Sequence, residues 1–172
     1  MRHLIAMVAA SALGSTLVLA QMMPATAHAE LRNADGKTIG HATLTEGSNG
    51  VLIHVELTGA AAGVHAFHIH AVGQCTPPFT SAGGHFNPAQ RQHGLVNPPG
   101  HHAGDLPNVT VPESGALTLD VFADGVTLGS GSTSLFDADG SALVMHGGAD
   151  DYRSDPAGNA GPRIACGVIT KG

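Results

Sequence analysis

The sequence predicts an all-β domain at residues 30–172, and three observations support this. This region holds 23 of the 24 glycines in the chain, no Trp and one Tyr, a composition that suits many tight turns. Several of its segments alternate apolar and polar residues with the period of two that is typical of strands. No segment shows a convincing period of 3.6, so the core must be closed by sheet packing on sheet or by a barrel.

The expected strands follow in order along the chain. In the second of them, Val51, Ile53 and Val55 would face the core, while Leu52 and His54 would face solvent. Short segments rich in Gly, Ser, Asn or Asp separate neighbouring strands. About eight short strands are expected, at residues 37–45, 51–57, 65–72, 117–121, 126–128, 132–136, 142–146 and 164–170.

Two stretches fit neither a strand nor a tight turn. Residues 73–112 are rich in Pro, Gly and His, and residues 147–162 are rich in Gly, Asp and Pro. Loops of this length in a compact domain are usually functional. The sequence shows no internal repeat and no sign of a separate second domain, so residues 30–172 are expected to form one domain.

Residues 1–29 have the pattern of a secretory signal peptide. A weakly basic start precedes an apolar stretch, and the small-x-small triplet 27–29 (AHA) precedes Glu30. The triplet 18–20 (VLA) is a weaker alternative cleavage site. Ser11, Gly14 and other small or polar residues interrupt the apolar run, which argues against a membrane anchor. We therefore expect export to a periplasmic or extracellular location, without stable membrane insertion.

Charge and cysteine content add two expectations for the exported chain. Six basic residues stand against thirteen acidic ones after residue 29, a net charge of −7 that argues against a nucleic-acid partner. Cys75 and Cys166 are the only cysteines, so in an oxidising compartment they can pair with each other alone.

Ten of the twelve histidines follow residue 29, and most are clustered. His68 and His70 are spaced i, i+2, which on a strand points both imidazoles to one face and Phe67 and Ile69 to the other. Imidazole is a good ligand for copper and for zinc. Two nitrogen ligands are therefore expected to be presented together.

The loop that follows contributes four further candidate ligands, at His85, His93, His102 and Asp105. Three histidines and one aspartate make a closed four-ligand shell of the kind that zinc prefers. A single histidine of this set would more simply be a surface or hydrogen-bonded residue. The whole set is better explained by metal binding, because the loop offers little apolar burial to hold four imidazoles.

These motifs closely resemble those of the copper,zinc superoxide dismutases, in the form secreted by bacteria. The resemblance covers residues 37–172. It is carried by residues 65–70 (HAFHIH), 84–88 (GHFNP), 102–109 (HAGDLPNV) and 158–169 (GNAGPRIACGVI). It implies an eight-stranded Greek-key flattened β-barrel, similar to an immunoglobulin-like sandwich, with two long functional loops.

The resemblance also implies a role for individual residues. The copper ligands of the family correspond to His68, His70, His85 and His146, and the zinc ligands to His85, His93, His102 and Asp105. His85 would thus bridge the two metals. Asp150 corresponds to a buried aspartate that joins a copper histidine to a zinc histidine, Arg163 to the active-site arginine, and Cys75–Cys166 to the intrasubunit disulfide.

The implied activity is the disproportionation of superoxide to oxygen and hydrogen peroxide. One copper per subunit would cycle between Cu(II) and Cu(I), and one zinc would be structural. His85 would act as a general acid and Arg163 would hold the anion. An alternative is a periplasmic copper- and zinc-binding or delivery protein on the same fold. The choice between monomer and homodimer stays open.

The departures from the family pattern are few. Ala66 stands where the family usually has Gly, and the segment 147–163 is short, with Arg153 as its only basic residue besides Arg163. Neither departure removes a ligand. The remaining histidines are expected to lie at the surface, at His41, His54 and His101, or to bond backbone, at His65.

Overall fold

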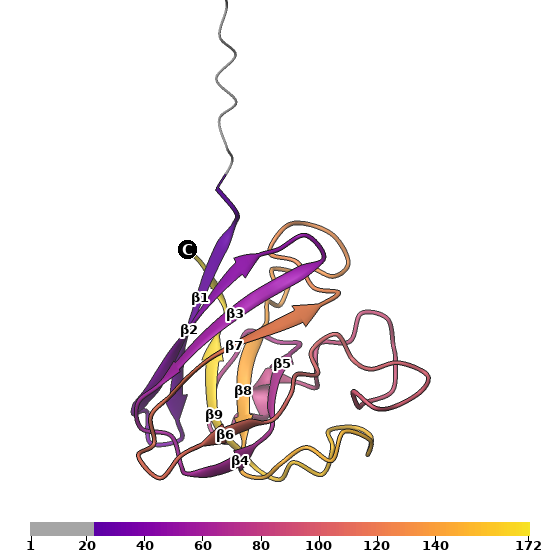
Figure 1. Ribbon diagram of the computed structural model, residues 1–172. Coiled ribbons are helices and arrows are strands. Elements are labelled where there is room, and N and C mark those ends of the chain that lie inside the picture. The colour runs from indigo at the N-terminus through magenta and orange to yellow at the C-terminus, as the bar shows by residue number, and fades with distance from the viewer. Residues whose placement is uncertain (1–22) are drawn as a thin grey trace, which may run out of the picture.

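The computed structural model describes residues 23–172. Ten strands account for nearly all of the regular structure in this part of the chain (Figure 1). They are β1 (Thr26–Asn33), β2 (Thr38–Glu46), β3 (Gly50–Leu57), β4 (Gly63–His65), β5 (Phe67–His70), β6 (Val109–Val111), β7 (Leu117–Asp124), β8 (Ala142–His146), β9 (Arg163–Val168) and β10 (Thr170–Lys171). The only helical segment among these residues is a 3₁₀ turn, η1 (Thr80–Ala82). None of the described helices could span a membrane. The expected all-β fold is confirmed.

One curled antiparallel sheet forms the body of the molecule. Its strand order is β5-β8-β9-β1-β2-β3-β7, with β10 pairing β1, and a separate two-stranded sheet joins β4 to β6. Figure 1 shows β1, β2, β3 and β7 on one side of the curl and β5, β8 and β9 on the other. The long loops 71–108 and 147–162 both extend from the side of β5 and β8. The fold thus brings the two segments expected to be functional to one face.

The core fills the inside of the curl. In β3 the side chains of Val51, Ile53 and Val55 are buried and that of Leu52 is exposed, as the alternation predicts. In β5 every residue is buried, because Phe67 and Ile69 pack in the core while the loops cover the opposite face. A strand buried on both faces therefore carries the first pair of histidines.

Two expected strands are absent. Residues 126–128 and 132–136 make only an isolated bridge between Thr127 and Ser134. The Glu46 carboxylate accepts hydrogen bonds from the Thr127 hydroxyl and the Leu128 amide, and Ser134 Oγ accepts one from the Phe136 amide. Side-chain acceptors thus replace sheet partners at Leu128 and Phe136. The expectation also omitted β4, β6 and β10, which are two or three residues long.

Strand β1 was not expected either, since the expected strands begin at Lys37, and it crosses the expected domain boundary at Glu30. Residues 1–22 of the expected leader lie outside the described residues, but Thr26 to Ala29 are the first four residues of β1. Ala27 and Ala29 are buried, and all four residues pair with β2. The folded domain therefore includes residues that the sequence pattern assigns to the leader.

The expected disulfide is present. Cys75 and Cys166 are bonded, with their Cα atoms 5.6 Å apart, and the described chain has no free cysteine. The bond fastens the long loop 71–108 to β9. It lies against a small apolar cluster that includes Phe79, Val144 and Cys166.

Candidate metal centre

Strand β5 supplies the first two histidines of a buried cluster. His68 and His70 have no exposed surface, and the antiparallel pairing of β5 with β8 brings them beside His146 at the end of β8. The Nε2 atoms of His70 and His146 lie 3.4 Å apart. His85 joins them from the loop, with its ring centroid 4.0 Å from that of His68.

The cluster consists of two groups that share one residue. The first group holds the four histidines His68, His70, His85 and His146, and the second holds His85, His93, His102 and Asp105. Within each group the candidate ligand atoms lie within 4.8 Å of one another, and all seven residues are buried. The structure thus brings together every residue expected to be a metal ligand, with His85 between the two groups.

In the first group, hydrogen bonds fix the outer nitrogen of three rings. His68 Nε2 donates to Asp150 Oδ2 at 3.0 Å, His70 Nδ1 to the Gly83 carbonyl at 2.9 Å, and His146 Nδ1 to the Gly161 carbonyl at 3.3 Å. These contacts leave the other nitrogen of each ring without a bond to a backbone or carboxylate oxygen. Partners of this kind orient a ligating imidazole and fix its tautomer.

Two buried nitrogens have no hydrogen-bond partner. They are Nδ1 of His68 and Nε2 of His85, and Ser141 Oγ is the only other such side-chain atom in residues 23–172. Burying a polar atom without a partner is unfavourable, so orphaned atoms are rare in folded proteins. A metal ion bound by both nitrogens satisfies them, and the first group therefore fits a metal with nitrogen ligands.

The second group is organised around one carboxylate oxygen. Asp105 Oδ1 lies 2.7 Å from His85 Nδ1, 3.0 Å from His93 Nδ1 and 3.3 Å from His102 Nδ1. Ligand atoms bound to zinc at 2.0–2.1 Å in a tetrahedron are about 3.3 Å apart. Asp105 Oδ2 accepts bonds from the amides of Gly94 and His102. The group fits zinc, with its carboxylate held in place from behind.

Burial makes three histidines of the first group weak bases. It lowers the pKa of His70 to about 2 and the pKa values of His85 and His146 to about 4, with the neighbouring histidines adding to the effect. Neutral imidazole is the form that binds metal. These three side chains are therefore ready to ligate at neutral pH.

In the second group, hydrogen bonds outweigh burial and keep two side chains charged. Burial opposes ionisation of Asp105, but hydrogen bonds from His102, His85 and His93 hold the pKa of its carboxyl well below the usual range. Burial also opposes protonation of His93, yet its bonds to Asp105 and Asp150 raise the pKa of this imidazole to about 9. Before metal binds, the second group thus contains a carboxylate and a protonated histidine.

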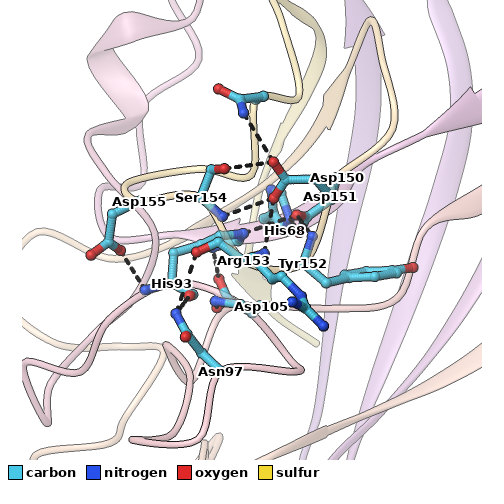
Figure 2. A network of polar contacts seen from close by, with 12 residues as sticks. His68, His93, Asn97, Asp105, Asp150, Asp151, Tyr152, Arg153, Ser154 and Asp155 are labelled. Carbon is cyan, nitrogen blue, oxygen red and sulfur yellow. Dashed lines mark hydrogen bonds and ion pairs between the residues drawn. The ribbon is translucent and has the colours of Figure 1, made fainter.

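Besides the shared His85, the carboxylate of Asp150 also connects the two groups. Its Oδ2 accepts from His68 Nε2 and its Oδ1 accepts from His93 Nε2 at 2.9 Å (Figure 2). Burial disfavours the charged form, but these two histidines hold the pKa of the carboxyl well below its usual value. Gly158 makes room for this contact, since a Cβ there would lie 1.8 Å from Asp150 Oδ1. Asp150 thus joins the two groups as the resemblance implies.

Residues that the sequence analysis did not single out fasten the loop 147–162 to the second group. The Asp155 carboxylate accepts from the amide of His93, and Asn97 Nδ2 donates to the His93 carbonyl at 2.6 Å and to the Arg153 carbonyl at 3.3 Å (Figure 2). Asn108 Nδ2 donates to the Asp150 carbonyl at 2.9 Å, and Asn108 Oδ1 accepts from the Asp150 backbone amide at 2.8 Å. The backbone amide of Asn108 donates to the hydroxyl of Tyr152. Asn and Asp are common in loops, so no spacing distinguished these residues.

Arg163, the first residue of β9, lies beside the first group. Its Nη1 donates to the Phe79 carbonyl and its Nη2 to the Gly83 carbonyl, each at 2.6 Å. With Thr80 and Pro162 it lines a surface cavity of about 310 Å³. The Gly83 carbonyl also accepts from His70, so a single atom holds both the guanidinium and a candidate ligand.

The remaining histidines lie outside both groups. His65 Nδ1 donates to the His146 carbonyl at 2.8 Å, which confirms the expected bond to backbone. His41 is exposed and His54 contacts Asp120 at 2.7 Å on the outer face of the sheet. His101 donates to the His102 carbonyl at 2.7 Å and belongs to neither group.

A curled antiparallel sheet that carries two buried ligand groups joined by one imidazole defines a binuclear metalloprotein. Comparison with known proteins specifies the family. The family model for copper/zinc superoxide dismutase matches residues 38–169, and the chain belongs to this family.

Individual relatives agree with this assignment. The chain is 54% identical over 146 residues to a copper-zinc superoxide dismutase of Aquifex aeolicus, covering 83% of this chain and 85% of the relative. A copper-zinc superoxide dismutase of Caulobacter vibrioides is 45% identical, with coverage of 84% and 85%. The crystal structure of a SOD-like protein from Bacillus subtilis is similar with a TM-score of 0.79 at 40% identity, covering 82% of this chain and 96% of that one.

Proposed function

We propose that this protein disproportionates superoxide to oxygen and hydrogen peroxide with a copper ion in the first group and a zinc ion in the second. The shared residue His85 carries this proposal. Its Nδ1 belongs to the second group, while its Nε2 is buried, aimed into the first group and without a partner. An imidazole with a metal on each nitrogen accounts for both atoms.

The donor atoms support this distribution of the metals. Three imidazoles and one carboxylate form a closed tetrahedral shell, as in structural zinc sites. Four imidazoles suit copper, which also needs access for its substrate. Copper, when bound, supplies one-electron redox chemistry by alternating between Cu(II) and Cu(I), which zinc cannot do.

Arg163 supports anionic substrate binding. Two of its N–H groups donate to the carbonyls of Phe79 and Gly83, which leaves other donors of the guanidinium for a small anion. Charge-assisted hydrogen bonds from arginine are short and strong. A protein that only stored or delivered metals would have no need for a cation fixed beside the first group, so that alternative is not favoured.

His85 and Asp150 take part in handling the proton. His85 can hold a proton at Nε2 while Nδ1 remains on the zinc side, and can donate it to the departing peroxide as a general acid. Asp150 keeps His68 and His93 oriented through its two carboxylate oxygens. Two superoxide ions and two protons then give one oxygen and one hydrogen peroxide.

We also infer that the protein is exported through the leader in its N-terminal sequence. A disulfide between Cys75 and Cys166 persists in an oxidising compartment, and bacterial relatives support this location.

The decisive experiment is to load the purified protein with copper and zinc and to measure superoxide decay per bound copper. We expect one copper and one zinc per chain and decay far faster than in the buffer. The matched control is His146→Ala, which should keep zinc and lose activity, since it removes a ligand of the first group alone. Full metal loading without any acceleration would contradict the proposed function.

A further inference from the structure

The N-terminal half of β1 coincides with the motif that resembles a cleavage site. Along Thr26–Asn33 the side chains alternate between exposed and buried, with Ala27, Ala29 and Leu31 facing the core. Ala27 has no exposed surface and Ala29 has 3%. Small residues at alternate positions occur both in a strand that buries them and in the small-x-small triplet of a cleavage site. The structure assigns the triplet 27–29 to the strand.

Residues 26–29 hold two parts of the sheet together. On one side they pair with residues 42–45 of β2, and on the other Ala27 and His28 pair with Lys171 and Thr170 of β10. In the part of the chain that the structure describes, β10 has no other strand partner. Backbone bonds at the N-terminal end of β1 extend these contacts on both of its edges, because Ala25 accepts from the amide of Glu46 and Thr26 accepts from the amide of Gly172.

Cleavage after Ala29 would remove these contacts. Four of the seven residue pairs between β1 and β2 would be lost, together with every pair between β1 and β10. Buried surface of Leu44 and other core residues would be exposed to water, which is unfavourable. Another small-x-small triplet, at residues 25–27, would place the cut inside β1 as well.

We propose that the leader is removed upstream of β1, by hydrolysis of the Ala20–Gln21 bond, and that the exported chain keeps the whole of β1. This proposal rests on the export proposed above. Val18 and Ala20 provide the small residues that a signal peptidase requires, at the end of the apolar stretch 4–20. Water adds its hydroxyl to the Ala20 carbonyl carbon and a proton to the Gln21 nitrogen as the peptide bond breaks.

The first test determines the N-terminus of the exported protein. The full chain is expressed in a bacterium, purified from the periplasm and analysed by N-terminal sequencing and intact mass. We expect a chain that begins at Gln21. A chain beginning at His28 or Glu30 would overturn the proposal, while metal content and dismutase activity of the same sample judge the proposed function separately. A periplasmic chain that keeps Met1 would overturn the cleavage site, and absence of the protein from the periplasm would overturn export.

The second test asks whether β1 needs its first four residues. Three chains are produced without a leader, starting at Gln21, at Pro24 and at Glu30, and are loaded with both metals. The first two should melt at the same temperature, because residues 21–23 precede the strand. The third should melt lower by about 10 °C or more, or fail to fold. Equal melting of all three would remove the physical basis of the proposal.

Discussion

At the scale of single residues, the Gly83 carbonyl oxygen connects Arg163 to a candidate metal ligand. It accepts hydrogen bonds from His70 Nδ1 at 2.9 Å and from Arg163 Nη2 at 2.6 Å. The position of the guanidinium is therefore tied to the position of a proposed copper ligand. Replacing Arg163 removes the cation without removing a candidate ligand, which makes it a clean test of anion binding.

We expect Arg163→Ala to bind both metals and to dismute superoxide about 10- to 100-fold more slowly per copper, since a hydrogen bond to a charged group contributes about 1.5–3 kcal/mol. Superoxide decay and metal analysis on the same samples measure this. Arg32→Ala is the matched control, because Arg32 is exposed on β1 and pairs with Glu30. Equal rates per copper in Arg163→Ala and the parent protein would contradict the role of Arg163.

His93 gives zinc binding a pH dependence. Its hydrogen bonds to Asp105 and Asp150 raise its pKa to about 9 in the metal-free protein, and a protonated imidazole cannot bind zinc. Zinc affinity of the metal-free protein should therefore rise by up to about tenfold per pH unit from pH 7 to 9. Titration against a competing chelator measures the affinity. A flat profile, after correction for the chelator, would show that this proton is absent.

At the scale of elements, two loops form one structure around the metal groups. The loop 71–108 carries His85, His93, His102 and Asp105, and the loop 147–162 carries the residues that hold them. Asn108, just before β6, pairs with both backbone groups of Asp150. It is thus one of the contacts that fix the second loop, together with the bond from the His93 amide to Asp155.

Asn108→Ala should weaken zinc binding by about 10- to 100-fold, the usual effect of removing a partner of metal-binding residues. Because Asn108 touches no candidate ligand, its loss should leave the His85 contact to Asp105 intact. Chelator competition gives the affinity, and Asn49→Ala in the turn between β2 and β3 is the control. Unchanged zinc affinity would mean that Asp150 is positioned without Asn108.

The sequence predicts elements well where side chains alternate along a paired strand. The residues of β3 follow the expected alternation, and β8 and β9 lie close to their expected ranges. Strand β1 was not predicted, and its first half was assigned to the leader because a leader pattern and a strand pattern coincide at residues 27–29. Residues 126–128 and 132–136 were expected to form strands, and the prediction was wrong because side-chain oxygens of Glu46 and Ser134 accept backbone hydrogen bonds there.

The site could be predicted only in part, because some of its contacts join residues that are distant in sequence. Residue type and spacing indicated the candidate ligands, and the structure brings them together. Asp155, Asn97 and Asn108 act through backbone atoms of residues that are distant in sequence, so their roles depend on how the two loops meet. The division of ligands between copper and zinc stays a prediction.

At the scale of the whole molecule, the buried histidines link stability to pH. The pKa values of His70, His85 and His146 are lowered by burial, so the unfolded chain binds protons below pH 6.5 that the folded chain does not. Stability is therefore lost as the pH falls from 6.5 toward 4. Asp105 and Asp150, with pKa values below the usual range, add to this loss below about pH 4. His93 acts in the opposite direction, because its raised pKa contributes stability that is lost as the pH rises through 9.

The metal-free protein should therefore be most stable near pH 6.5. On the acid side each of the three histidines with lowered pKa removes up to about 1.4 kcal/mol per pH unit, and His93 alone acts on the alkaline side. Denaturant unfolding between pH 4 and 9 measures the free energy. A maximum below pH 5 would contradict the assignment, and the exposed-histidine variant His41→Gln should leave the profile unchanged.

The disulfide protects the chain from hydrogen peroxide, the product of superoxide disproportionation. Hydrogen peroxide oxidises cysteine thiolates to sulfenic acid and then irreversibly to higher acids. This chain has two cysteines, and both are consumed in the bond between Cys75 and Cys166. Met145, the methionine beside His146, is 1% exposed and packed in the core. The folded domain thus presents no thiol, and at this position no accessible thioether, to the oxidant that it generates.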